Sequence, residues 1–197
     1  MSDDRVPSGI DGLDSLIDGG LPKGSLILLA GNPGTGKTVF GMQFLCKGAQ
    51  DYGENGIYVS FAESEDTLVD NMSKLFGYDL TTMEGDGKVK VLDFTTVTEK
   101  GLSTILEMVL KEITALKAKR LVIDSFSAMA QAFKEPIEAR IILHNILGKM
   151  VRQLGCTTIL ISEVPTGDEK IGISIEEFVA DGVIVLRRED VDGKFVR

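Results

Sequence analysis

The segment from Gly31 to Thr38 reads Gly-Asn-Pro-Gly-Thr-Gly-Lys-Thr and fits the pattern G-x-x-x-x-G-K-S/T. Its glycines allow the backbone to curl so that successive N–H groups point inward at phosphate oxygens. A helix that starts near Lys37 adds its positive N-terminal end to the same anion. We therefore expect a phosphate-binding loop, with these candidate nucleotide-binding residues: Asn32, Pro33, Gly34, Thr35, Gly36, Lys37, Thr38 and Val39.

Two side chains of this loop have chemistry of their own. The ammonium group of Lys37 is expected to reach the β- and γ-phosphates of a nucleoside triphosphate and to stabilise the transferring phosphoryl group. The hydroxyl of Thr38 is expected to bind the Mg²⁺ that bridges the same phosphates. The loop therefore predicts a nucleotide and Mg²⁺ as ligands, with Lys37 among the catalytic residues.

Three acidic residues follow apolar runs and are candidates for the same site. Asp124 is expected to hold Mg²⁺, although an acid at a strand end can also cap the next helix. Glu63 is the candidate that orients and deprotonates an attacking water, and the alternative is a solvated loop carboxylate. Glu163 either contacts the γ-phosphate or holds Mg²⁺, and the sequence leaves its role open.

The elements that position these residues alternate along the chain. Apolar runs predict strands over residues 26–30, 57–62, 89–94, 120–124, 157–162 and 182–186. Helical spacing of apolar residues predicts helices near 10–17, 37–52, 65–76, 102–116 and 137–151. This order is typical of a doubly wound α/β fold with a mainly parallel sheet flanked by helices. Ligands of such sheets bind at the carboxyl ends of the strands.

Length and composition limit the class of protein. A chain of 197 residues predicts one domain, with a lead-in over 1–24, a core over 25–188 and the start of a C-terminal hairpin over 189–197. A net charge of −9 argues against nucleic acid as the main partner. No apolar run approaches the length of a membrane span, and we expect Cys46 and Cys156 to be small buried side chains. These features predict a cytoplasmic protein without a membrane partner.

Taken together, several segments resemble the RecA-type ATPases and, within them, the KaiC-like family. They are Gly9–Asp14, Gly19–Gly24, the loop Gly31–Thr38, Val59–Glu63, Leu121–Ser125, Ile171–Ser174 and Asp181–Leu186. The resemblance implies a RecA-like P-loop NTPase fold with a hairpin at the C-terminal edge of the sheet. It also implies ATP and Mg²⁺ as ligands and a homo-hexameric ring with ATP between subunits.

The chain departs from the family pattern at three places. The second-strand motif usually carries paired glutamates, but here Ala62 precedes the single Glu63. Glu176-Glu177 stands where the second domain of cyanobacterial KaiC carries its phosphorylated Ser-Thr pair, which weakens an autokinase interpretation. Family members continue into strands that contact ATP on the neighbouring subunit, so the end at Arg197 predicts a shortened chain or impaired assembly and hydrolysis.

The leading hypothesis is a Mg²⁺-dependent ATPase with a regulatory or signalling role. A nucleotide-gated oligomeric interaction module with little turnover is the alternative, and an autokinase or a DNA recombinase-like protein ranks below both. The sequence does not name the protein partner, and the choice of ATP over GTP comes from the resemblance alone.

Overall fold

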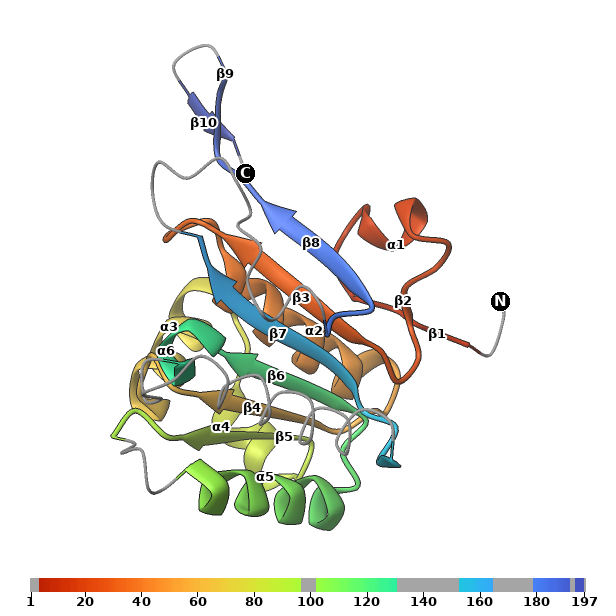
Figure 1. Cartoon of the computed structure of the whole chain (residues 1–197), viewed down its shortest axis with the longest axis vertical. Coiled ribbons are helices and arrows are strands. Elements are labelled where there is room, and N and C mark those ends of the chain that lie inside the picture. The colour runs from red at the N-terminus through yellow and green to blue at the C-terminus, as the bar shows by residue number, and fades with distance from the viewer. Residues whose placement is uncertain (1–3, 97–101, 131–152, 165–178, 192–193, 197) are drawn as a thin grey trace.

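A six-stranded parallel sheet forms the centre of the molecule (Figure 1). The computed structural model describes residues 4–96, 102–130, 153–164, 179–191 and 194–196. From one edge to the other, the strands are β5 (Val89–Asp93), β4 (Gly56–Ser60), β6 (Arg120–Asp124), β7 (Thr157–Glu163), β3 (Leu26–Gly31) and β8 (Gly182–Leu186). Two antiparallel pairs lie outside this sheet, β1 (Arg5–Val6) with β2 (Leu21–Pro22) and β9 (Glu189–Val191) with β10 (Lys194–Val196).

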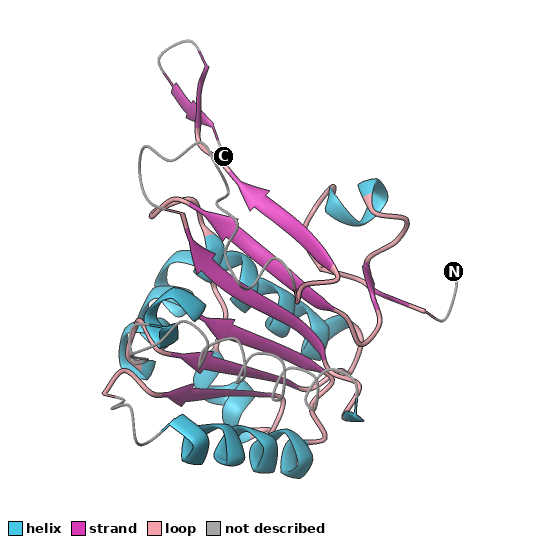
Figure 2. Ribbon diagram, in the orientation of Figure 1, coloured by secondary structure: helices cyan, strands magenta, loops and turns pink. Residues whose placement is uncertain are grey.

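Helices cover both faces of the sheet, which gives three layers (Figure 2). One face packs against α2 (Lys37–Asp51), α3 (Glu65–Phe76) and α4 (Leu80–Gly85). The opposite face packs against α5 (Leu102–Leu116) and α6 (Phe126–Ala130), while the short α1 (Leu13–Leu16) lies beside the sheet near the N-terminus.

The central strands are apolar on both faces because each face is buried. Along β3, Leu28 packs toward α5, whereas its neighbour Leu29 packs toward α2. The same alternation places Val59 and Tyr58 of β4 on opposite faces. This pattern is expected of parallel strands inside a doubly wound fold. Packing on both faces fixes the sheet, so the carboxyl ends of its strands lie along one rigid edge.

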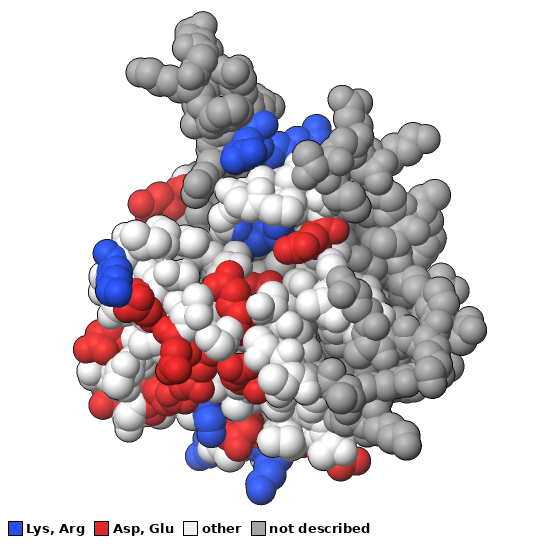
Figure 3. Space-filling model, turned by 90° about the vertical axis from the view of Figure 1, so that its left-hand side faces the viewer, with Lys and Arg blue, Asp and Glu red and all other residues white. Residues whose placement is uncertain are grey.

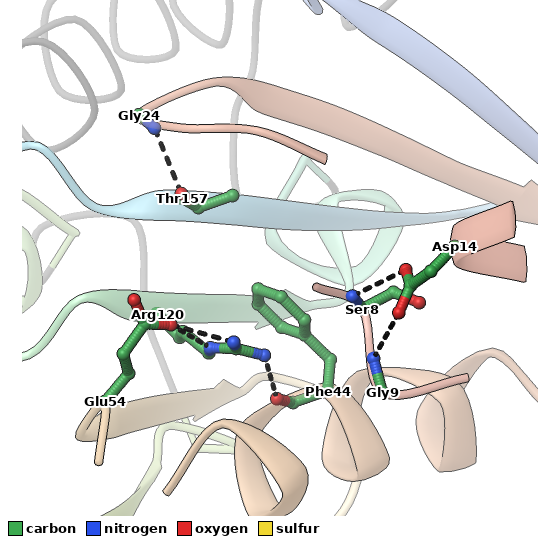
Figure 4. Close-up of polar contacts among 8 residues, drawn as sticks. All are labelled: Ser8, Gly9, Asp14, Gly24, Phe44, Glu54, Arg120 and Thr157. Atoms are coloured by element: carbon green, nitrogen blue, oxygen red, sulfur yellow. Dashed lines mark hydrogen bonds and ion pairs between the residues drawn. The ribbon is translucent and has the colours of Figure 1, made fainter. Parts of the chain in front are cut away.

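A buried arginine joins α2 to the sheet (Figure 4). Arg120 at the start of β6 is fully buried, and its Nη1 donates a 2.8 Å hydrogen bond to the carbonyl oxygen of Phe44. Its Nε donates to Glu54 Oε2 at 2.7 Å, and Nη2 contacts the same oxygen as an ion pair. The guanidinium also stacks 4.5 Å from the centre of the Phe44 ring. This charge is therefore paired and covered rather than exposed.

The fold class and the strands are confirmed, but several helices differ from the expectation. The helix expected over 10–17 is a single turn, because Gly12 at its start has a φ of 81° and Asp18 after its end has a φ of 55°. The Asp14 carboxylate instead holds the preceding segment by accepting hydrogen bonds from the N–H groups of Ser8 and Gly9 (Figure 4).

Two short helices, α4 and α6, have no counterpart among the expected elements. Side-chain caps start both: Asp79 accepts from Thr82 N at 3.0 Å, and Ser125 accepts from Ala128 N at 3.2 Å.

The helix expected over 137–151 lies outside the described residues. Within the described part of the chain, no helix is long and apolar enough to cross a membrane. Cys46 and Cys156 are buried free thiols, as expected.

Candidate functional site

The candidate site lies where the four central strands end (Figure 1). Strand β3 ends at Gly31, its neighbour β7 ends at Glu163, and β6 on the far side of β7 ends at Asp124. The next strand, β4, ends at Ser60, three residues before Glu63. Parallel pairing therefore gathers the loop and all three candidate carboxylates at one edge of the sheet.

The phosphate-binding loop folds around the amine of Lys37. Lys37 Nζ donates to the carbonyl oxygens of Gly31 at 2.9 Å and Asn32 at 3.0 Å. Left-handed backbone at Gly34 and Gly36, with φ of 77° and 95°, produces the curl. The described hydrogen bonds also tie the loop to β7, since Asn32 Nδ2 donates to the carbonyl oxygen of Val164 at 3.0 Å.

The remaining loop positions surround this amine. Thr35 is buried and donates to the carbonyl oxygen of Asn32 at 2.8 Å, while Pro33 and Gly34 are exposed and Val39 is half-buried. Burial lowers the pKa of Lys37, and the nearby carboxylates of Glu163 and Asp124 oppose this shift. A phosphate anion at the loop would add further negative charge beside the same amine.

Asp124 faces the loop rather than the helix that follows it. Its Oδ2 accepts a 2.9 Å hydrogen bond from Thr38 Oγ1 and a second hydrogen bond from the Tyr58 hydroxyl. Helix α6 is capped instead by Ser125, which follows Asp124 through a cis peptide bond. The alternative in which Asp124 caps the next helix therefore does not describe this structure.

Glu63 is half-buried in the turn after β4. Ser60 Oγ donates to the carbonyl oxygen of Glu63 and accepts from its N–H at 3.1 Å, which fixes this turn. The backbone N–H of Phe61 donates to the carbonyl oxygen of Asp124 at 2.6 Å, so the turn lies against the end of β6. Burial, and then the Asp124 carboxylate, raises the pKa of Glu63.

Glu163 is the most exposed of the three candidate acids. Its backbone N–H donates to Ser127 Oγ at 2.8 Å, and its carboxylate raises the pKa of Lys37. Strand pairing places Glu163 opposite Gly31, where the loop begins, and leaves its two expected roles open.

Sequence reasoning missed two residues beside the site. Tyr58 belongs to an apolar run that predicts a strand, and nothing in its spacing distinguishes it from a core residue. Its hydroxyl is completely buried and donates to the Asp124 carboxylate. Arg188 follows β8, and its Nη1 would lie 3.9 Å from a Cβ built on Gly34. Only the strand order, which brings β8 beside β3, reveals that proximity.

Acidic side chains gather on the same face, as the red area in Figure 3 shows. The pKa of Glu65 is raised, first by burial and then by the neighbouring carboxyls of Glu84, Asp66 and Asp93. No three His, Cys, Asp or Glu side chains within the described ranges form a group that could hold a metal ion.

The fold and the loop together define the class of protein. A parallel sheet in this order, with a glycine-rich loop after β3 and an acid at the end of β6, is a RecA-type P-loop NTPase fold. The model of the KaiC ATPase family matches residues 6–197, and this chain belongs to that family. Family membership supports nucleotide binding at the loop.

Known relatives agree with this assignment. A KaiC-like protein of Pyrococcus horikoshii has a solved structure that is 40% identical, covers 97% of this chain and 84% of its own, and superimposes with a TM-score of 0.84. A UPF0273 protein of Methanocaldococcus jannaschii is 33% identical over 98% of this chain and 84% of its own length. The circadian clock oscillator protein KaiC of Thermostichus vulcanus is 34% identical over 93% of this chain, which spans 36% of that relative.

Proposed function

We propose that this chain binds Mg·ATP and hydrolyses it as a regulatory or signalling ATPase. The observation that carries the proposal is the contact of Thr38 Oγ1 with Asp124 Oδ2 at 2.9 Å, with Glu63 close enough for Asp124 to raise its pKa. Phosphoryl transfer to water requires three groups beside a phosphate-binding loop. A hydroxyl and a carboxylate hold the metal, and a second carboxylate acts on the water.

Each group has one task in this proposal. Thr38 and Asp124 would hold Mg²⁺, whose charge neutralises the phosphate oxygens when it is bound. Lys37 leaves its loop carbonyls to bind the β- and γ-phosphates, and the loop N–H groups stabilise the charge that develops there. Glu63 accepts the proton of the attacking water, which is the step that requires a carboxylate near neutral pH.

Steady-state phosphate release from ATP tests the proposal directly. Turnover is expected with Mg²⁺ and is expected to stop when EDTA removes the metal. Binding of ATP without any phosphate release would contradict the hydrolytic part of the proposal while leaving nucleotide binding in place.

A nucleotide-gated oligomeric module is the second candidate function. It is favoured by Ala62, which is exposed beside Glu63 where the family usually has a second glutamate.

We propose a homo-hexamer as the assembly, with a protein partner and a cytoplasmic location. Sedimentation with and without a non-hydrolysable ATP analogue separates the two candidates, because the module assembles with nucleotide at negligible turnover. Residues 176–177, which bear on the autokinase alternative, lie outside the described residues.

The rate of hydrolysis is expected to depend on pH through Glu63. A base must be ionised to accept a proton, and burial together with Asp124 raises the pKa of this carboxyl above the ordinary value of 4.5. Turnover should therefore fall as the pH is lowered, with a midpoint above 4.5. Measurement of kcat between pH 4 and 8, about the range over which buried glutamates titrate, checks this, with circular dichroism to show that the fold persists. A rate that stays flat below the ordinary value would contradict it.

The Tyr58 hydroxyl is expected to position Asp124 for the metal. Burial, and then Asp124, raises the pKa of Tyr58 well above its ordinary value, so the hydroxyl stays protonated and donates. Tyr58→Phe keeps the packed ring but removes this donor, and the Mg²⁺ concentration for half-maximal turnover should rise about tenfold. Tyr78→Phe, which removes a hydroxyl in another part of the chain, is the control. An unchanged Mg²⁺ dependence in Tyr58→Phe would show that the hydroxyl only fills space.

A further inference from the structure

We propose that Arg188 is a phosphate-binding residue of the nucleotide site, supplied by the same chain that supplies the loop. This inference rests on the nucleotide binding proposed above. It concerns a residue that lies about 150 positions after the loop and belongs to no motif that the sequence analysis used.

Strand pairing explains why Arg188 reaches the loop. Strand β8 runs parallel to β3, with Leu186 opposite Gly31 at the point where the loop begins. The two backbones approach so closely that a Cβ on Gly31 would lie 2.6 Å from the carbonyl oxygen of Leu186. Two residues later, the Nη1 of Arg188 would lie 3.9 Å from a Cβ on Gly34, a loop residue that is itself exposed. A long side chain at this position reaches a phosphate in the loop by rotating its own torsions.

The charges around the site indicate why a second cation would stabilise a bound triphosphate. Three carboxylates lie at the sheet edge, those of Glu63, Asp124 and Glu163, and Lys37 is a buried cation among them. Figure 3 shows acidic side chains mainly over the middle and lower part of this face, with Lys and Arg side chains above them and others at its left and lower edges. A triphosphate carries more negative charge than Lys37 and one Mg²⁺ offset, so a second cation at the loop lowers the electrostatic free energy of the bound state.

An arginine suits this position better than a lysine would. Its planar guanidinium presents paired donors that match two phosphate oxygens. Because Arg188 comes immediately before β9, a bound phosphate would also fix the start of the β9–β10 hairpin.

Calorimetric titration with two probes tests the proposal. Mg·ATP reports binding of the whole nucleotide, and inorganic tripolyphosphate reports the phosphates alone, without base or ribose. Arg188→Ala is expected to weaken both probes about tenfold, because one charge-assisted hydrogen bond to an anion is lost. Arg188→Lys should recover part of the loss, and Arg187→Ala, which removes the same charge one residue away, should change affinity less than about twofold.

Four results would overturn the proposal. Weaker ATP binding with unchanged tripolyphosphate binding would assign Arg188 to the base or the ribose. An equal loss in Arg187→Ala would show a diffuse effect of net charge rather than a contact. A wild-type chain that binds neither probe would remove the nucleotide-binding proposal itself. If the wild-type chain binds both probes and Arg188→Ala binds them equally well, only the role of Arg188 is removed.

Discussion

Glu63→Gln is expected to reduce ATP hydrolysis by about 10²-fold or more while ATP still binds, because a positioned general base contributes about 10²–10⁴-fold to the rate. The amide has the size of the carboxylate and keeps hydrogen-bonding groups, but it cannot accept the proton of the attacking water. Ser60 holds this turn through the backbone of Glu63 rather than through its side chain. The substitution should therefore leave the geometry of the turn unchanged. Single-turnover phosphate release, measured beside ATP affinity, separates chemistry from binding.

Glu65→Gln is the matched control for this prediction. It makes the same chemical change two residues further on, in the first turn of α3 and within the acidic cluster. Its turnover should stay within about twofold of wild type, since its raised pKa comes from burial and from other acids rather than from contact with the loop. Full turnover in Glu63→Gln, or an equal loss in both variants, would remove Glu63 from the catalytic role.

Local sequence was enough to predict the loop and most of the sheet. The loop needs glycine at Gly34 and Gly36 because the backbone there is left-handed. The residue types alone therefore predict the conformation of the loop. The buried strands are continuous apolar runs, which no surface element shares. The position of Asp124 followed from the same reasoning, because the end of a buried strand in a parallel sheet lies at the ligand edge.

The rest depended on the order of the strands, which apolar patterns do not encode. Tyr58 resembles any core residue until β4 and β6 are seen to be neighbours, with its hydroxyl beside Asp124. Arg188 resembles a surface charge until β8 is paired with β3. Helix α1 is shorter than the apolar spacing over 10–17 predicts, because the backbone leaves the helical region at Gly12 and at Asp18. Long-range pairing therefore supplied the parts of the site that spacing could not.

Gly48→Ala is expected to destabilise the fold by about 3 kcal/mol, although alanine favours a helix over glycine by about 1 kcal/mol. Gly48 lies on the face of α2 that meets Arg120, and a Cβ there would lie 2.3 Å from Nε and 2.4 Å from Cδ of that arginine. The guanidinium cannot move aside freely, because Glu54 and the carbonyl oxygen of Phe44 hold it in a fully buried position (Figure 4). Urea unfolding of the two proteins measures the difference.

Two further variants separate the contact from a general effect of alanine. Gly85→Ala, at the end of α4 where a Cβ would meet no atom within 4 Å, should change the free energy of unfolding by less than about 1 kcal/mol. In an Arg120→Met background, Gly48→Ala should cost about 1 kcal/mol or less, because a flexible thioether can adapt to the added methyl group. An equal cost in both backgrounds would show that the helix, and not the buried guanidinium, requires glycine at this position. The smaller cost would instead show that Arg120 sets how closely α2 packs on the strand that ends at Asp124.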